Sequence, residues 1–196
     1  ATWDEALADI GGRIRKAIVA GRREEVMYHV GRPGEDHFMQ RLMGWLFARR
    51  WLSDARKLEW YPPFWMMRIR VLELRDNWRT VRILLPLNSV SRNPGGVMFG
   101  GFQASLADPV AALACARVFP GHSVWTRGMS IDFDRGGGTD LELRFAITAS
   151  QEADIRAELA SRGRATPTFE YGYHLTDGTR CTRIRDTVAI RPRNYA

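Results

Sequence analysis

The segment that decides the fold runs from Asn93 to Val118 and reads NPGGVMFGGFQASLADPVAALACARV. It begins as a glycine-rich loop and continues as a long apolar run with one carboxylate, Asp108, in its middle. The run is about as long as a membrane span, about 20 residues, but the central acid and the initial glycines favour a buried helix in a soluble fold. An acid costs free energy when it is buried without a partner. We therefore expect Asp108 either in a chemical site, in an ion pair with an arginine, or capping a helix break before Pro109.

The segments before Pro62-Pro63 carry hydrophobic residues at helical spacing, over residues 3–30 and 36–60. Beyond the two prolines the pattern is mostly strand-like. This change predicts an N-terminal helical extension over residues 1–61 and a second domain over residues 62–196. The extension mixes aromatic residues with arginines, which is compatible with contact to a membrane surface. We favour the alternative that it packs on its own domain.

Two alternating segments, residues 64–76 and 78–87, follow the prolines and are joined at Asp76-Asn77. Such a pair predicts a β-hairpin. The alternation in the first segment places one set of side chains on a single face: Trp65, Met67, Ile69 and Val71.

Further strands are predicted over residues 122–135, over 139–150, and over 167–191, where Asp177-Gly178 splits the segment in two. A short helix over 152–163 ends at Gly163, a typical C-cap residue. The order of elements favours an α+β fold in which an antiparallel sheet wraps around the long central helix. Asp108 would then be buried, with its pKa raised by loss of solvent.

The composition gives a formal net charge of +7, which suits polyanionic partners such as nucleic acid, an anionic membrane or a phosphate-bearing metabolite. Nearly all the basic residues are arginines, a bias that often reflects genome composition. No motif of a nucleic-acid-binding family accompanies the charge, so we expect no nucleic-acid partner. Cys115 and Cys181 form neither a disulfide framework nor a metal-ligand pattern. With no signal peptide evident, we expect a cytoplasmic protein without metal or cofactor.

The loop and helix together resemble the hotdog-fold acyl-CoA thioesterases of the phenylacetic-acid-pathway type. That family shows an asparagine, five intervening residues, His-Gly-Gly, and an acid nine residues after the histidine. Here the matching residues are Asn93, Phe99, Gly100, Gly101 and Asp108. Some members carry a serine or threonine eighteen residues after the acid, which is Thr126 here. The resemblance covers roughly residues 64 to 191.

The resemblance implies a homodimer, or a dimer of dimers, that hydrolyses an acyl-CoA thioester. Asp108 would be the base or the nucleophile, and Asn93 would hold the water or the carbonyl. The amides of Gly100 and Gly101, at a helix N-terminus, would form the oxyanion hole. Thr126 is a weaker candidate for the same site.

Phe99 stands where the family has its histidine, and it could line an acyl pocket but transfer no proton. This favours the alternative that the protein is a non-catalytic hotdog that binds acyl-CoA or fatty acyl ligands. Neither His122 nor His174 is well placed along the chain to replace the histidine. Because coenzyme A carries phosphates, we expect arginines near the mouth of the site, with Arg127 and Arg135 as candidates.

Overall fold

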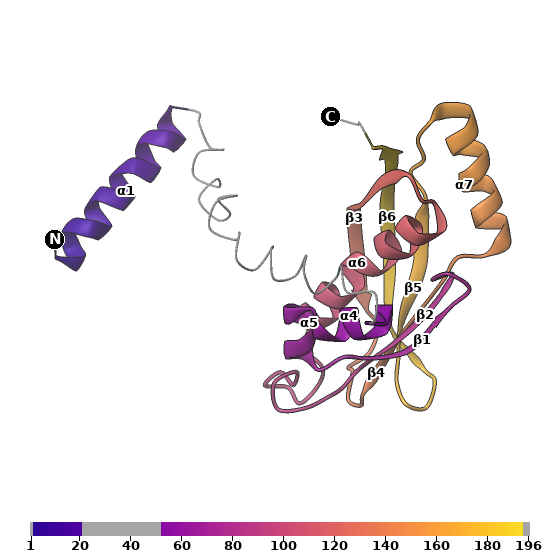
Figure 1. Cartoon of the computed structure of the whole chain (residues 1–196). Coiled ribbons are helices and arrows are strands. Elements are labelled where there is room, and N and C mark those ends of the chain that lie inside the picture. The colour runs from indigo at the N-terminus through magenta and orange to yellow at the C-terminus, as the bar shows by residue number, and fades with distance from the viewer. Residues whose placement is uncertain (1, 21–51, 194–196) are drawn as a thin grey trace. The chain divides into compact units, whose positions relative to one another are not determined.

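The computed structural model describes residues 2–20 and 52–193. The chain divides into two compact units, residues 1–50 and 51–196. The first contains α1 (Trp3–Val19), which has acids in its first turn and Lys16 in its last (Figure 1). That charge distribution complements the helix dipole. The predicted helical patterns over 21–30 and 36–51 lie outside the described residues.

The second unit includes α4 (Asp54–Trp60), which precedes the predicted domain boundary at residue 62. Ser53 caps this helix, since its side chain accepts a hydrogen bond from the Arg56 N–H. Glu59 Oε1 accepts from the backbone N–H of Val71 at 2.9 Å. Helix α4 is thus attached to the sheet by a side-chain hydrogen bond. The boundary at residues 61 and 62 itself stays a prediction.

A six-stranded antiparallel sheet forms the body of the second unit, in the order β1-β2-β4-β5-β6-β3. Its strands are β1 (Arg70–Arg75), β2 (Thr80–Leu85), β3 (His122–Phe133), β4 (Leu141–Ala146), β5 (Thr168–His174) and β6 (Arg180–Pro192). Strand β3 pairs with β6 over its whole length and not with β4, its neighbour in sequence. β1 and β3 are therefore the two edges of the sheet.

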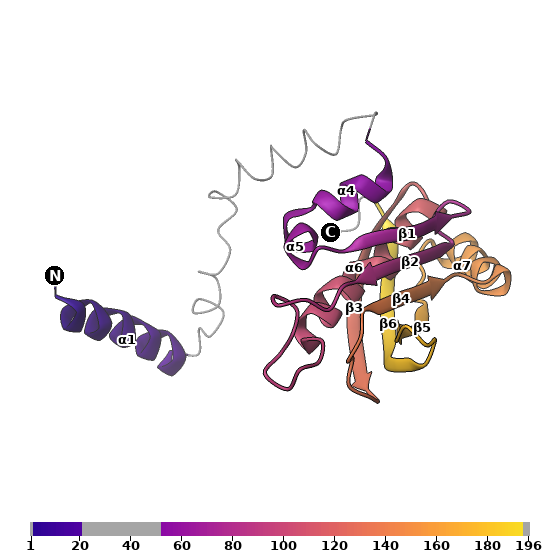
Figure 2. The same cartoon turned by 90° about the horizontal axis from the view of Figure 1, so that it is seen from below.

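Helix α6 (Gly100–Val118) packs against one face of this sheet and contacts β2, β3, β4 and β6. The sheet curves around it, as Figures 1 and 2 show. Two tyrosines of β5 fix the helix, because the hydroxyls of Tyr171 and Tyr173 lie within hydrogen-bonding distance of the Ala107 and Gln103 carbonyls. The predicted sheet wrapped around a long helix is confirmed. No helix in residues 2–20 and 52–193 is both long and apolar enough to cross a membrane.

Residues 62–67 differ from the prediction, because they form helix α5 (Pro62–Met67) rather than the first half of a strand. The two prolines occupy the first positions of the helix, where their missing N–H groups cost nothing. Arg68 ends it in the left-handed conformation, at φ 57°. As a result Trp65 is exposed, while Met67 and Ile69 remain buried.

The other predicted elements are present with small shifts in their ends. The β1–β2 turn contains Asp76 and Asn77 at positive φ. Helix α7 (Ala149–Arg162) begins with a capping box at Thr148 and Gln151 and ends at Gly163, at φ 65°. Local turn and cap chemistry therefore fixed these boundaries.

Candidate active site

The loop before α6 is held by Asn93. Its side-chain oxygen accepts a hydrogen bond from the Val97 N–H at 3.2 Å, and its own N–H donates to the Val97 carbonyl at 2.8 Å. Two further backbone bonds connect the end of the loop to its surroundings, from Met98 N–H to Gly137 and from Phe99 N–H to Ser91. Asn93 thus has a structural role in shaping the loop.

The N-terminus of α6 lacks a side-chain cap, since Phe99 occupies the N-cap position. Among the described residues, no acceptor lies within hydrogen-bonding distance of the Gly100 and Gly101 amides. A β-carbon at Gly101 would overlap the Phe99 ring, and one at Gly100 would touch the Phe133 ring at 3.0 Å. The two rings are 50% and 54% exposed. The helix therefore presents two free N–H groups between accessible aromatic rings.

Asp108 is exposed, so the prediction of a buried acid is wrong for the single chain. It lies on the side of α6 that no other described element covers. Helix α6 also continues through Pro109, which excludes a cap at a helix break. Within the described residues, no arginine or lysine is within ion-pair distance of the Asp108 carboxylate. Its carboxylate is therefore available to another molecule.

Thr126 contacts the backbone of Asp108 and not its carboxylate. The Thr126 hydroxyl donates to the Asp108 carbonyl oxygen at 2.6 Å, across 18 residues of sequence. This bond fixes the turn of α6 that carries Asp108 to strand β3. The structure thus brings the two residues together, with Thr126 in a positioning role.

A second acid, Asp186 of β6, lies buried beneath the same turn. Tyr171 Oη lies 3.0 Å from Asp186 Oδ2 and 2.9 Å from the Ala107 carbonyl oxygen. A phenol has one proton, so it can donate to only one of them. Asp186 Oδ1 has no hydrogen-bond partner among the described residues. No motif in the sequence marks Asp186, whose one signal is a polar residue at an inward position of an alternating strand.

The pKa of Asp186 is raised to about 6, chiefly by burial and further by the charge of Asp108, against the opposing effect of the Tyr171 hydrogen bond. When it is protonated, Asp186 can donate to Tyr171 Oη, which then donates to Ala107. When it is ionised, it accepts from Tyr171 instead. The protonation state of Asp186 therefore decides whether Tyr171 donates its hydrogen bond to Ala107, in the helix turn that bears Asp108.

The two candidate arginines lie apart. Arg127 is the extra residue of a β-bulge in β3, between the paired positions Thr126 and Gly128. Arg135 follows the end of β3, donates its backbone N–H to Cys181, and helps to lower the pKa of Asp177, after the Thr179 hydrogen bonds. The two therefore cannot serve a single phosphate.

The two candidate histidines, His122 and His174, also lie away from the N-terminus of α6. His122 follows the far end of that helix, with Nδ1 3.3 Å from the Phe119 carbonyl oxygen. His174 pairs with Glu142 across β4 and β5, and burial lowers its pKa. Neither replaces the histidine at the Phe99 position.

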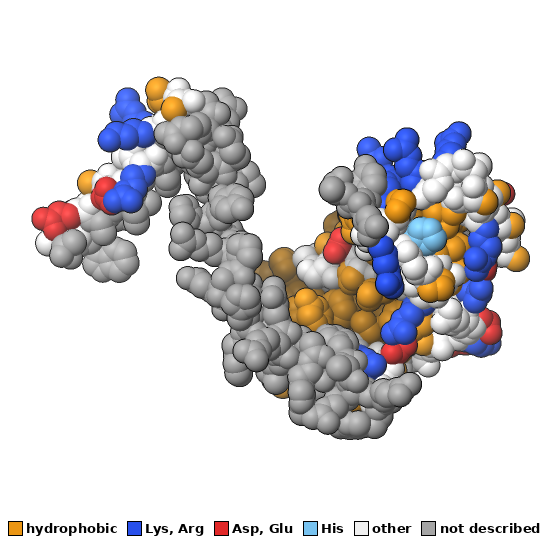
Figure 3. All heavy atoms as spheres, turned by 45° about the horizontal axis from the view of Figure 1, so that its top comes forward, with side chains coloured by type: hydrophobic (Ala, Val, Ile, Leu, Met, Phe, Trp, Pro, Cys, Tyr) orange, Lys and Arg blue, Asp and Glu red, His pale blue; other side chains and the backbone are white. Residues whose placement is uncertain are grey.

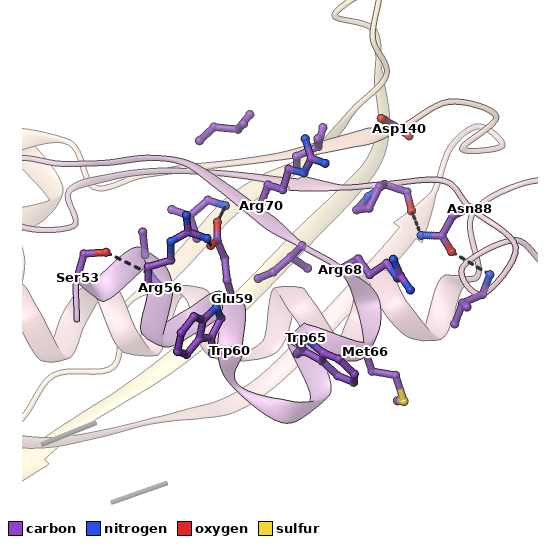
Figure 4. Close-up of a pocket in the computed structure, with 17 residues that line it drawn as sticks. Ser53, Arg56, Glu59, Trp60, Trp65, Met66, Arg68, Arg70, Asn88 and Asp140 are labelled. Carbon is purple, nitrogen blue, oxygen red and sulfur yellow. Dashed lines mark hydrogen bonds and ion pairs between the residues drawn. The ribbon is translucent and has the colours of Figure 1, made fainter. Parts of the chain in front are cut away.

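A cavity of 1080 Å³ that no motif predicted lies between helices α4 and α5 and edge strand β1 (Figure 4). Its wall combines aromatic and basic side chains, including Trp60, Trp65, Arg56, Arg68 and Arg70. None of the predicted site residues lines it. The cavity is therefore distinct from the α6 site, because the two have no lining residue in common.

Comparison with known proteins gives one family and a set of similar structures. The family model described as "Domain of unknown function (DUF4442)" matches residues 49–188. No curated protein matches the chain. A crystal structure from Pseudomonas aeruginosa, described as a protein of unknown function and probable thioesterase, is similar with a TM-score of 0.62 at 19% identity. It covers 70% of this chain and 92% of its own.

Two further structures have the same architecture. A putative thioesterase from Shewanella oneidensis has a TM-score of 0.55 at 15% identity and covers 80% of this chain and 99% of its own. A mutant thioesterase from Pseudomonas aeruginosa has a TM-score of 0.56 at 19% identity and covers 73% and 97%. At these identities the similarity establishes the fold, and the predicted hotdog fold is confirmed.

Proposed function

The chain belongs to the DUF4442 family, a domain of unknown function, and from its hotdog fold and its α6 site we propose that it hydrolyses acyl-CoA thioesters. The observation that carries the proposal is the pair of Gly100 and Gly101 amides without acceptors at the start of a 19-residue helix. Helix N-terminal amides attract negative charge. A thioester carbonyl placed there would gain about 3–4 kcal/mol per donor as it becomes an oxyanion.

Asp108 is the proposed base or nucleophile, but it lies too far from these amides within one chain. Seven residues of helix separate Gly101 from Asp108, which is about 10 Å along the axis. One carbonyl cannot contact both. We therefore propose that the acid of one copy works with the amides of a second copy in a homodimer.

The second copy is proposed to join at β3. This edge strand has 12 residues, and no strand of residues 52–193 pairs with its outer side. An exposed strand edge is a template for pairing with another chain. The uncovered face of α6 that carries Asp108 lies next to β3, to which Thr126 attaches it. A symmetric contact there would bury both features at once.

The proposed reaction needs no group beyond the chain and water. Asp108 takes a proton from water, and the hydroxide attacks the carbonyl carbon. The amides hold the resulting oxyanion until the carbon–sulfur bond breaks and the thiolate receives the proton. In the alternative mechanism, Asp108 itself attacks the carbonyl carbon and the thiolate leaves. Water then cleaves the anhydride that results. Asn93 and Thr126 shape the loop and the helix turn, and Phe99 lines the acyl side.

The test is release of thiol from acyl-CoA substrates of different chain length. Asp108→Asn keeps the size of the side chain and should lower kcat by at least ~100-fold, since a general base contributes about that much. Asp154→Asn, at an exposed aspartate of α7, is the matched control and should keep full activity. Full activity in Asp108→Asn would exclude the mechanism.

The second candidate function is non-catalytic binding of acyl-CoA or a fatty acyl ligand. Phe99 favours this second function. Its ring lies against Gly101, and it stands at the position where the thioesterases that the chain resembles have a histidine, which can donate a proton. Binding of acyl-CoA without turnover across the same substrate panel would select this function. The two buried free thiols, Cys115 and Cys181, suit the reducing cytoplasm that we propose for either function.

A further inference from the structure

A basic pocket of 490 Å³ lies where the start of β3 and the end of β6 meet the segment after α7. Four arginines line it, Arg127, Arg162, Arg164 and Arg191, together with Trp125. It is separate from the 1080 Å³ cavity, and Asp108, Gly100 and Gly101 are not among the residues that line it. Figure 3, in which the top of Figure 1 comes forward, shows basic side chains gathered over this end of the second unit.

The backbone presents these arginines from three elements. The β3 bulge sets Arg127 outside the regular pairing, and bulges commonly redirect a side chain. Arg162 and Arg164 flank Gly163, whose left-handed conformation ends α7. Arg191 is 8% exposed, and its guanidinium donates to the Ala165 carbonyl at 2.6 Å and to Thr166 Oγ1 at 3.0 Å. Arg191 therefore forms a fixed floor for the more exposed arginines.

The pocket has an excess of positive charge. Its one lining acid is Glu158, which lies 3.6 Å from Arg162 in a pair that is 70% and 37% exposed. An exposed ion pair such as that of Glu158 and Arg162 contributes little free energy. Among the described residues, no acid is within ion-pair distance of Arg127 or Arg164. Mutual repulsion of the arginines would be relieved by a ligand with more than one negative charge.

We propose that this pocket binds the phosphorylated nucleoside end of a ligand. Guanidinium groups bind phosphate oxygens in a two-pronged geometry, and Trp125, which is 41% exposed, offers a ring on which a base can stack. If the proposed function holds, the ligand is the 3′-phosphorylated adenosine diphosphate end of coenzyme A.

The pocket lies close to the proposed acid along strand β3. Trp125 and Arg127 are the chain neighbours of Thr126, whose hydroxyl binds the carbonyl of Asp108. The pocket and the proposed acid therefore meet the edge strand β3 at the same level, but on opposite faces of the sheet, because successive side chains of a strand alternate between its faces. The nucleotide end would be held on the face away from α6, and the pantetheine arm would pass the start of β3 to bring the thioester to α6.

The first experiment measures binding of adenosine 3′,5′-bisphosphate to the full chain by calorimetry. The wild type should bind, and Arg162→Ala/Arg164→Ala should raise Kd by about tenfold or more, because charge-assisted hydrogen bonds are lost. Arg180→Ala is the matched control, an exposed arginine of β6 outside the pocket, and should leave Kd unchanged. Absence of binding to the wild type, or equal Kd in the double variant with an intact fold by circular dichroism, would overturn the proposal.

The second experiment identifies the source of the nucleoside. With an acyl-CoA, the double variant should raise KM about tenfold and leave kcat unchanged, whereas an acyl-pantetheine of the same chain length should show no change. Loss of bisphosphate binding with an unchanged KM for acyl-CoA would support the pocket but assign it to a free nucleotide. Bisphosphate binding without hydrolysis of either substrate would support the pocket and refute the proposed function alone.

Discussion

Two nearby aspartates, Asp108 on α6 and Asp186 on β6, have opposite environments. Asp108, the acid that the sequence motif marks, is exposed, and Asp186, which no motif marks, is buried. The apolar run around Asp108 suggested burial on all sides, but the helix is covered only where the sheet reaches it. The polarity of an inward position on β6 could not be interpreted without knowing that β3 and β5 flank it. Helical spacing was therefore a poor guide to burial here.

Asp186 should make stability depend on pH. Its pKa is about 6 in the folded protein and 3.8 ordinarily, so between these values the folded state holds a proton that the unfolded chain has released. The free energy of unfolding should therefore fall by about 2 kcal/mol as pH rises from about 4 to 6, and by about 3 kcal/mol over the full titration from below about pH 3 to above about pH 7. Urea unfolding of Asp186→Asn should show a smaller fall and a higher free energy than wild type above pH 6. Parallel curves for the two proteins would contradict this assignment.

At the scale of elements, α7 is joined to the start of β2 by Glu152. Its carboxylate accepts from Arg79 Nε and Nη2 at 2.6 and 2.9 Å and from Arg156 Nε and Nη2 at 2.9 and 2.7 Å. The Arg79 hydrogen bond, followed by that of Arg156, lowers the pKa of Glu152 to about 2. The sequence predicted the helix but gave no indication of this contact across 73 residues.

Glu152→Gln should lower the free energy of unfolding by about 1–2 kcal/mol at pH 7, because two charge-assisted contacts become neutral. Thermal unfolding followed by circular dichroism measures the effect. Asp154→Asn, at an exposed residue two positions further along α7, should change stability by less than about 0.5 kcal/mol. Equal melting temperatures for the two variants would show that the Glu152 carboxylate stabilises the fold no more than an exposed surface charge does.

Strand β5 contains a glycine that the sheet requires. A β-carbon at Gly172 would overlap the Thr182 carbonyl of β6, which is backbone and cannot rotate away. We expect Gly172→Ala to destabilise the protein by about 2–3 kcal/mol, as overpacking commonly does. Chemical denaturation should show this loss, while Gly138→Ala, where a β-carbon meets open space, should show little. Wild-type stability in Gly172→Ala would mean that β5 and β6 can shift apart.

At the scale of the whole molecule, the proposed site requires two copies. Leu113 is 37% exposed on the uncovered side of α6, and a charge there would be buried without a partner in the dimer. Sedimentation should give the wild type twice the 22.4 kDa chain mass. Leu113→Arg should weaken dimerisation roughly tenfold or more and lose thioester hydrolysis in parallel.

The control is Leu72→Arg, at a leucine that is 48% exposed on β1, the opposite edge of the sheet. It should remain dimeric and active. A fully active monomer of Leu113→Arg would refute the shared site but leave the fold untouched. A wild-type monomer at all concentrations would have the same consequence.

The sequence by itself determined the order of elements, the hairpin turns, the caps of α7 and the loop-to-helix unit around Gly100 and Gly101. These depend on residues close together in the chain, where turn and cap preferences act directly. Only the tertiary structure decided which face of α6 stays open, that Asp186 lies beneath Asp108, and that Arg127 joins Arg162 and Arg164. Those relations arise from the pairing of β3 with β6, and contacts between distant segments leave no periodic trace in a single sequence.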